Sequence, residues 1–156
     1  MFETVVRTRI TCHTLPRIVY NGGMGLARTA VDRHVAYWNA RDRASWVKLF
    51  SDDVTFEDPV GTPPKTGAEA VHNSWDRSFR PGRRWYLRPR QIVEAGAEAA
   101  VVMRNEGHLG DRVVEVNGIE IFTVDDDGLI VSVRSFFDQP TEFALDDYFT
   151  PNRDNS

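Results

Sequence analysis

The order of the predicted elements indicates an α+β fold, in which three helices pack on one face of a curved, mostly antiparallel sheet. Three helical patterns occur before residue 80. From residue 84 onward, runs of β-branched and aromatic residues alternate with short turns. Consecutive strands joined by tight turns pair antiparallel. One sheet covered on a single side by helices leaves a conical space, and that space can hold a pocket.

The first helix is predicted from about Thr29 to Ala40. Its apolar and aromatic side chains recur at the i, i+3, i+4 and i+7 positions of one face, namely Val31, His34, Val35 and Trp38. His34 therefore belongs to the buried side of this helix. A histidine on an apolar face is either a hydrogen-bonded core residue or a catalytic group, and both interpretations stay open.

Two further helices are predicted from their start signals. Asp42 has the position of an N-cap for a helix over residues 43–50. Thr66 and Glu69 match a capping box, which predicts a third helix that ends near Phe79.

The stretch Val54–Gly61 is a short strand that ends in an acid and a proline turn. Period-two alternation places Val54, Phe56 and Asp58 on the same face. An acid that faces the core reflects a misassigned register, a satisfied buried group or a functional site.

Four later segments are predicted as strands, over residues 85–93, 99–106, 113–124 and 129–137. Pro89 marks the first of them as an edge or bulged strand. On the long strand, Glu120 shares a face with Val116 and Phe122. Glu120 is therefore a second acid in apolar company.

The composition is that of one globular domain, since 156 residues with 41% hydrophobic and 27% charged side chains can build a sizeable core. The net charge of −4, with both signs interspersed, gives no reason to expect nucleic acid or a membrane as partner. The single cysteine excludes an intrachain disulfide and suits a cytoplasmic protein. We expect the domain at residues 24–140, a C-terminal tail at 141–156, and an N-terminal extension at 1–23 that is either disordered or an added edge strand.

The sequence contains none of the spacings that hold a metal or phosphate. His34, His72 and His108 lie in different predicted elements, without an HxH or HExxH pattern, and there is no phosphate loop. The spacing of these residues therefore gives no reason to expect a metal site. Two acids in an apolar cavity instead favour acid–base chemistry, because desolvation shifts their pKa values toward neutrality.

Several motifs along the chain carry a family resemblance. They are Asn39-Ala40-Arg41-Asp42, Leu49-Phe50-Ser51-Asp52-Asp53, Glu57-Asp58-Pro59-Val60-Gly61, Thr66-Gly67, Ile119-Glu120-Ile121-Phe122 and Val131-Ser132-Val133-Arg134-Ser135-Phe136-Phe137. Together they resemble the bacterial Δ5-3-ketosteroid isomerases of the NTF2-like, or SnoaL-like, superfamily. The resemblance implies a conical α+β barrel, a homodimer formed through the sheet, a steroid-like hydrophobic substrate and no cofactor.

The resemblance also implies roles for individual residues. Asp58 matches the family's general base, an aspartate that moves a proton next to a ketone. His34 stands where the family has a hydrogen-bonding tyrosine, and Glu120 stands where it has a hydrogen-bonding aspartate. Trp75 replaces a further pocket tyrosine. We expect the apolar substrate pocket to be lined by Trp75, Phe56, Val101, Met103, Val116, Phe122 and Phe137.

The resulting hypothesis is an isomerase that shifts a double bond from Δ5 to Δ4 in a 3-ketosteroid or similar hydrophobic ketone. A first alternative is a SnoaL-like cyclase, dehydratase or hydrolase that acts on a polycyclic or terpenoid substrate with His34 and Asp58. A second alternative is a steroid- or lipid-binding protein without catalysis, because one fold supports many functions.

Overall fold

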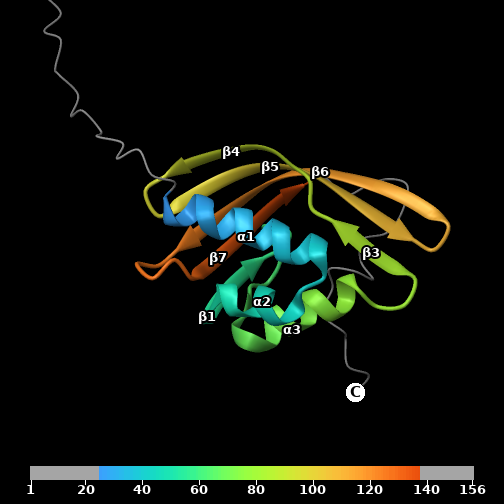
Figure 1. Cartoon of the computed structure of the whole chain (residues 1–156), viewed down its shortest axis with the longest axis horizontal. Helices are drawn as coiled ribbons and strands as arrows, with labels where there is room; N and C mark the ends of the chain where they lie inside the picture. The colour runs from blue at the N-terminus through green and yellow to red at the C-terminus, as the bar shows by residue number, and fades with distance from the viewer. Residues whose placement is uncertain (1–24, 138–156) are drawn as a thin grey trace, which may run out of the picture.

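The computed structural model describes residues 25–137, which form three α-helices and seven strands (Figure 1). The helices are α1 (Leu26–Ala40), α2 (Arg43–Trp46) and α3 (Gly67–Ser78), and a 3-10 turn, η1 (Val47–Leu49), follows α2. The strands are β1 (Phe50–Glu57), β2 (Lys65–Thr66), β3 (Arg83–Tyr86), β4 (Pro89–Ala95), β5 (Glu98–Leu109), β6 (Arg112–Val124) and β7 (Ile130–Phe137). The predicted α+β class is confirmed.

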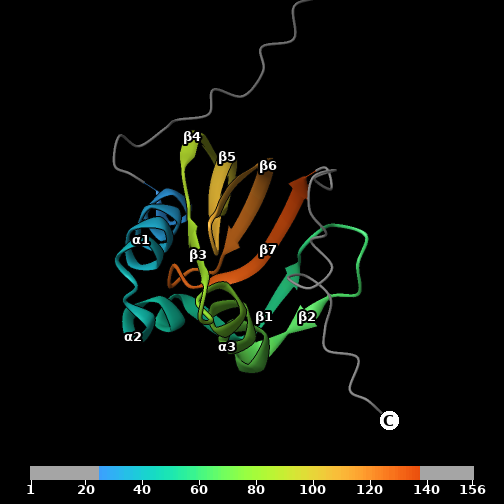
Figure 2. The same ribbon diagram turned by 90° about the vertical axis from the view of Figure 1, so that its right-hand side faces the viewer.

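The strands form one curved sheet in the order β2-β1-β7-β6-β5-β3, and β4 pairs with β5 beside this path. Within the described residues, β1 and β7 pair in parallel and the other neighbours pair antiparallel. All three helices lie on one side of the sheet, which curls around them (Figure 2). This arrangement produces the expected cone.

Helix α1 begins earlier than predicted because a distant carboxylate caps it. Glu94 on β4 accepts hydrogen bonds from the backbone N–H groups of Gly25 at 3.2 Å and Arg28 at 2.9 Å. A helix N-terminus otherwise leaves such donors unsatisfied, and its positive dipole end favours a carboxylate. Leu26 can therefore start the helix without a capping side chain of its own.

The second helix is shorter than predicted. Asp42 does cap it, since its carboxylate accepts a hydrogen bond from the Ser45 N–H at 3.0 Å. However, α2 ends at Trp46, and Phe50 already belongs to β1, where it pairs with Ile130. The 3-10 turn η1 takes the place of the last α-helical turn, and only Phe50 of the predicted helix joins the sheet.

The third helix begins where predicted, but without the expected capping box. Thr66 makes no side-chain capping bond to α3. It belongs instead to β2 and pairs with Thr55 of β1, so the sheet holds it in an extended conformation.

Three tryptophans join the helices to one another. The ring centroids of Trp38 and Trp46 lie 5.1 Å apart, and Trp75 lies 5.4 Å from Trp38 and 5.3 Å from Trp46. The Trp38 Nε1–H donates to the Trp85 carbonyl oxygen at 3.0 Å, which ties α1 to β3. Facing aromatic rings add stabilisation beyond the area they bury. The cluster thus fixes the helices against one end of the sheet.

The predicted extension at 1–23 and tail at 141–156 lie outside the described residues. Within residues 25–137, none of the helices has the length and apolar character needed to cross a membrane.

Candidate active site

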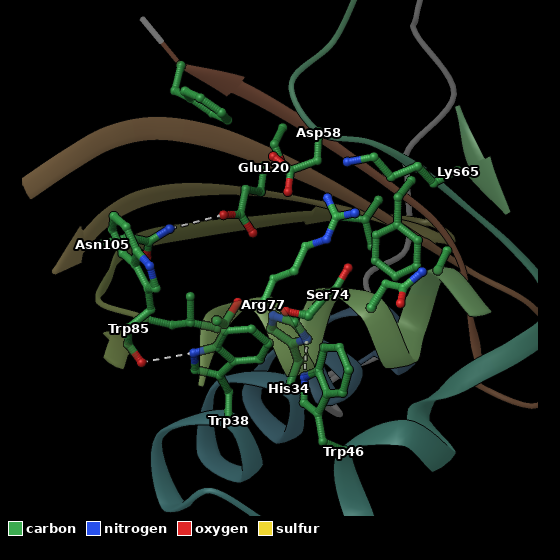
Figure 3. Close-up of a pocket in the computed structure, with 18 of the residues that line it drawn as sticks. His34, Trp38, Trp46, Asp58, Lys65, Ser74, Arg77, Trp85, Asn105 and Glu120 are labelled. Carbon is green, nitrogen blue, oxygen red and sulfur yellow. Dashed lines mark hydrogen bonds between the residues drawn. The ribbon is translucent and has the colours of Figure 1, made fainter. Parts of the chain in front are cut away.

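A cavity of about 420 Å³ lies between the helices and the inner face of the sheet (Figure 3). Small-molecule sites typically occupy ~300–1,000 Å³, so this one can enclose a ligand. Its apolar and aromatic lining includes Trp38, Trp46, Phe56, Leu87, Val116 and Phe137. Its polar lining includes His34, Asp58, Lys65, Arg77, Asn105 and Glu120.

Asp58 directly follows β1, and its carboxyl group faces the cavity (Figure 3). The preceding residue, Glu57, points the other way and accepts a hydrogen bond from Arg134 at 3.4 Å. Burial raises the pKa of Asp58 to about 6, although the positive charge of Lys65 and a hydrogen bond with Ser135 act to lower it. Asp58 is thus mostly ionised at neutral pH and is a stronger base than an ordinary aspartate.

Glu120 enters the same cavity from β6. Burial and, to a smaller extent, the negative charge of Asp58 raise its pKa to about 7, while a hydrogen bond from Asn105 acts to lower it. The Asn105 Nδ2 donates to Glu120 Oε1 at 3.2 Å, and the buried Asn105 Oδ1 has no hydrogen-bond partner among the described residues. Near neutral pH, Glu120 therefore retains its proton much more often than Asp58 does.

His34 lines the cavity from α1 and is only 7% exposed. Its Nδ1 lies 3.1 Å from the Trp46 Nε1, which is the hydrogen-bond donor. Burial lowers the pKa of His34 to about 3. The imidazole is therefore neutral throughout the physiological pH range.

The three residues predicted as catalytic, Asp58, His34 and Glu120, all line this one cavity. Asp58 and Glu120 lie near each other, whereas His34 lies across the cavity beside Trp46 (Figure 3). Among the described residues, the hydrogen bond of His34 is to Trp46, and none joins it to Asp58. The cavity thus contains two carboxyl groups with raised pKa values and a neutral imidazole.

Of the seven residues expected to line an apolar substrate pocket, three line this cavity and four do not. Phe56, Val116 and Phe137 line the cavity. Trp75, Val101, Met103 and Phe122 do not line it and belong instead to the buried core.

Packing explains why these four residues lie behind the cavity wall. The ring of Trp75 packs at a tilt against that of Phe79, with centroids 4.4 Å apart, within the aromatic cluster. Phe122 packs behind His34, with ring centroids 5.1 Å apart. Val101 and Met103 alternate with exposed neighbours along β5 and face inward, but they belong to the buried core.

A family model for the SnoaL-like domain matches residues 31–133, which is more than half of the chain. The protein belongs to the SnoaL-like family. This match contains all three cavity residues named above and confirms the family resemblance of the sequence motifs.

Relatives of this SnoaL-like protein include enzymes of two kinds. The steroid Δ-isomerase of Nocardioides simplex is 27% identical over 110 residues, which cover 70% of this chain and 88% of the relative. The Δ5-3-ketosteroid isomerase from Mycobacterium sp. has a TM-score of 0.63 and 22% identity, over 72% of this chain and 93% of its own. An LEH-like epoxide hydrolase from M. tuberculosis has a TM-score of 0.65 and 22% identity, over 72% of this chain and 83% of its own. These solved structures confirm the NTF2-like fold.

The polar residues Lys65, Arg77 and Asn105 were missed by the sequence interpretation. Arg77 was not singled out in the sequence, yet it extends into the cavity (Figure 3). One signal was available, since Asn73, Ser74 and Arg77 follow a helical spacing and form a polar stripe on α3. No three His, Cys, Asp or Glu side chains within residues 25–137 are grouped as a metal site requires.

Proposed function

We propose that this SnoaL-like protein is a cofactor-independent isomerase, which moves a double bond from Δ5 to Δ4 in a 3-ketosteroid or similar hydrophobic ketone. One observation carries the proposal. Asp58 and Glu120 face the same cavity with pKa values of about 6 and about 7. At neutral pH the first is mostly an ionised base, while about half of the second carries a proton that it can donate.

In the proposed mechanism, Asp58 removes a proton from the carbon between the ketone and the double bond. The electron pair moves onto the ketone oxygen and forms a dienolate. Protonated Glu120 and the His34 N–H donate hydrogen bonds to that oxygen, which stabilises the charge as it develops. Asp58 then returns the same proton to the far carbon of the former double bond, so atoms and electrons balance within one substrate.

The cavity suits a flat, hydrophobic substrate. Trp38, Trp46, Phe56 and Trp85 supply aromatic surface along its walls. Such a lining excludes water, and hydrogen bonds to a developing charge are stronger where water is absent. The apolar body of the ligand and its single ketone would then occupy different parts of one site.

The experiment is to follow the absorbance change that accompanies conjugation of a Δ5-3-ketosteroid. We expect Asp58→Asn to lower kcat by ~10²–10⁴-fold, the usual contribution of a general base. Glu57→Gln is the matched control, because the neighbouring acid points away from the cavity toward Arg134. Absence of turnover by the wild type, or an unchanged rate in Asp58→Asn, would overturn the proposal.

A second candidate is hydrolysis of an epoxide, favoured by the polar groups that extend the site beyond the two acids. Asp58 would deprotonate a water molecule and Glu120 would protonate the opening oxygen, near Lys65 and Arg77. Incorporation of ¹⁸O from labelled water into a diol distinguishes it from isomerisation. Tight steroid binding with neither reaction, and no exchange of ligand protons in deuterated water, indicates a binding protein instead.

A further inference from the structure

The hydrogen bond between His34 and Trp46 determines more than the orientation of the imidazole. It joins Trp46 Nε1 to His34 Nδ1 at 3.1 Å, and both residues line the cavity. An indole nitrogen donates a hydrogen bond but cannot accept one. His34 Nδ1 must therefore be the acceptor, which requires that it carry no proton.

We propose that Trp46 is a positioning residue, which holds His34 in the neutral Nε2–H tautomer so that this N–H donates to an oxygen of the bound ligand. A neutral imidazole has one nitrogen with a proton and one without. Since Nδ1 is the acceptor for Trp46, the proton belongs to Nε2. The tautomer itself does not depend on the proposed isomerase activity, whereas its catalytic consequence rests on that activity.

The surroundings of His34 support a permanently neutral ring. Phe122 lies 5.1 Å from it, Trp38 6.2 Å and Phe50 6.1 Å, measured between ring centroids. Burial alone accounts for the low pKa of His34, without the contribution of a charged neighbour. The ring is thus enclosed by aromatic surface that disfavours its cationic form.

The titratable side chains that share the cavity with His34 are Asp58, Glu120, Lys65 and Arg77. Among the described residues, none of them is hydrogen-bonded to His34, whose bond is to Trp46. The Nε2–H therefore remains a donor at a cavity wall. A ligand group that lacks an acceptor at this place would leave that buried donor unsatisfied, which costs free energy.

This assignment narrows the chemistry of the cavity. His34 acts as a hydrogen-bond donor and does not remove protons, so Asp58 is left as the base. The complementary ligand group is a carbonyl, enolate or ether oxygen, whereas an ammonium or amide N–H at this position is disfavoured. Trp46 acts through His34, and its indole N–H itself is not offered to the ligand.

The decisive measurement is ¹⁵N NMR of the full chain with labelled histidine and tryptophan. We expect a scalar coupling across the hydrogen bond between Trp46 Nε1 and His34 Nδ1, and an Nε2–H pattern that stays constant from about pH 5 to 9. His34→Gln assigns the signals, and His72→Gln, at an exposed position, is a control that leaves them unchanged. An Nδ1–H pattern, or protonation of His34 within this range, would overturn the inference.

Trp46→Phe supplies the second test, because it removes the N–H and keeps an aromatic ring. We expect the coupling to vanish, a second tautomer to appear, and kcat to fall by less than the roughly 100-fold expected when His34→Phe removes the donor itself. Trp38→Phe is the matched control for the NMR measurement alone, in which the coupling should persist, since its indole N–H bonds to the Trp85 carbonyl and not to His34. An unchanged imidazole pattern in folded Trp46→Phe contradicts the inference. Failure of isomerisation with the expected NMR pattern contradicts only the proposed function.

Discussion

The negative charge of Asp58 raises the pKa of Glu120, because the two carboxyl groups face one cavity from the end of β1 and from β6. Two like charges that share a poorly solvated space do not ionise together easily. The ionisation of Asp58 therefore helps Glu120 to keep its proton. One carboxyl can accept a proton while the other donates a hydrogen bond.

The first prediction concerns the pH dependence of activity. We expect kcat/KM to rise as Asp58 ionises near pH 6 and to fall as Glu120 loses its proton near pH 7. Glu120→Gln should remove the falling limb, because an amide still donates a hydrogen bond but does not titrate in this range. Steady-state rates across the pH range, with ¹³C NMR titration of both carboxyls, measure this.

Glu120→Leu provides the contrast, because it removes the donor. It should lower kcat/KM by about 100-fold below pH 7, with a smaller difference at higher pH, where wild-type Glu120 has already lost its proton. A falling limb that persists in Glu120→Gln would assign the alkaline titration to another group.

The second prediction concerns stability. Burial raises the pKa of Asp58 from 3.8 to about 6 in the folded protein, which corresponds to about 3 kcal/mol. The folded state therefore binds this proton more tightly than the unfolded state. The resulting stability is fully present below about pH 4 and is lost as the pH rises through about 6. We expect Asp58→Asn to raise the free energy of unfolding at pH 8 by up to about 3 kcal/mol, with little change at pH 3.5.

Urea denaturation at the two pH values measures this difference. Asp52→Asn is the control, because Asp52 is exposed on the same strand and should change the stability by less than about 0.5 kcal/mol. Equal free energies of unfolding for wild type and Asp58→Asn at pH 8 would show that burying the ionised Asp58 carboxylate does not destabilise the fold.

The inward-facing positions of Asp58, Glu120 and His34 could be predicted from the sequence, because the side-chain direction at each position follows from the period of a strand or a helix. Strand alternation placed Asp58 with Phe56 and placed Glu120 with Phe122. Helical spacing placed His34 among apolar neighbours. These rules state which face a side chain occupies, and one face of each element borders the interior.

Residues that depend on tertiary packing could not be predicted in this way. Lys65 enters the cavity because β2 lies at its edge, which no local pattern specifies. Arg77 belongs to the polar stripe of α3, but helical spacing alone does not show that this stripe borders a cavity. The Trp46 donor meets His34 because α2 turns back against α1. Phe122 faces inward as predicted, but His34 covers it, so it does not line the cavity.

The third prediction concerns the cap that Glu94 provides for α1. Glu94→Ala removes the acceptor for the Gly25 and Arg28 N–H groups, so we expect a loss of about 1–2 kcal/mol of unfolding free energy. Glu94→Gln should lose less, because it keeps one acceptor oxygen and loses only the charge at the helix end. Urea denaturation of the two variants and the wild type measures both losses of unfolding free energy.

Gly25→Ala tests the same cap by changing the helix residue that donates to Glu94. An added Cβ would lie 2.2 Å from a Glu94 carboxylate oxygen, so the carboxylate must move away. Glu98→Ala, an exposed acid on the neighbouring strand, is the control. Full stability of both Gly25→Ala and Glu94→Ala would show that α1 starts without help from β4.

The fourth prediction concerns the outer face of the sheet. Val102, Ile119 and Phe136 stand directly opposite one another across β5, β6 and β7. They are 41%, 47% and 39% exposed, respectively. An apolar row on a sheet surface is typical of a face that another protein covers. Since a second copy offers the same row, we predict a homodimer that forms through this face.

Ile119→Arg should separate the predicted dimer into monomers, because it places a charge at the centre of the row that the dimer would bury. Sedimentation equilibrium or light scattering after gel filtration measures the mass. Leu26→Arg changes an equally exposed side chain on the helical layer and should leave the dimer intact. A wild-type monomer contradicts the prediction, and a dimer that survives Ile119→Arg locates the interface elsewhere. Because His34, Asp58 and Glu120 face the opposite side of the sheet, monomeric Ile119→Arg should retain its cavity and its ligand affinity.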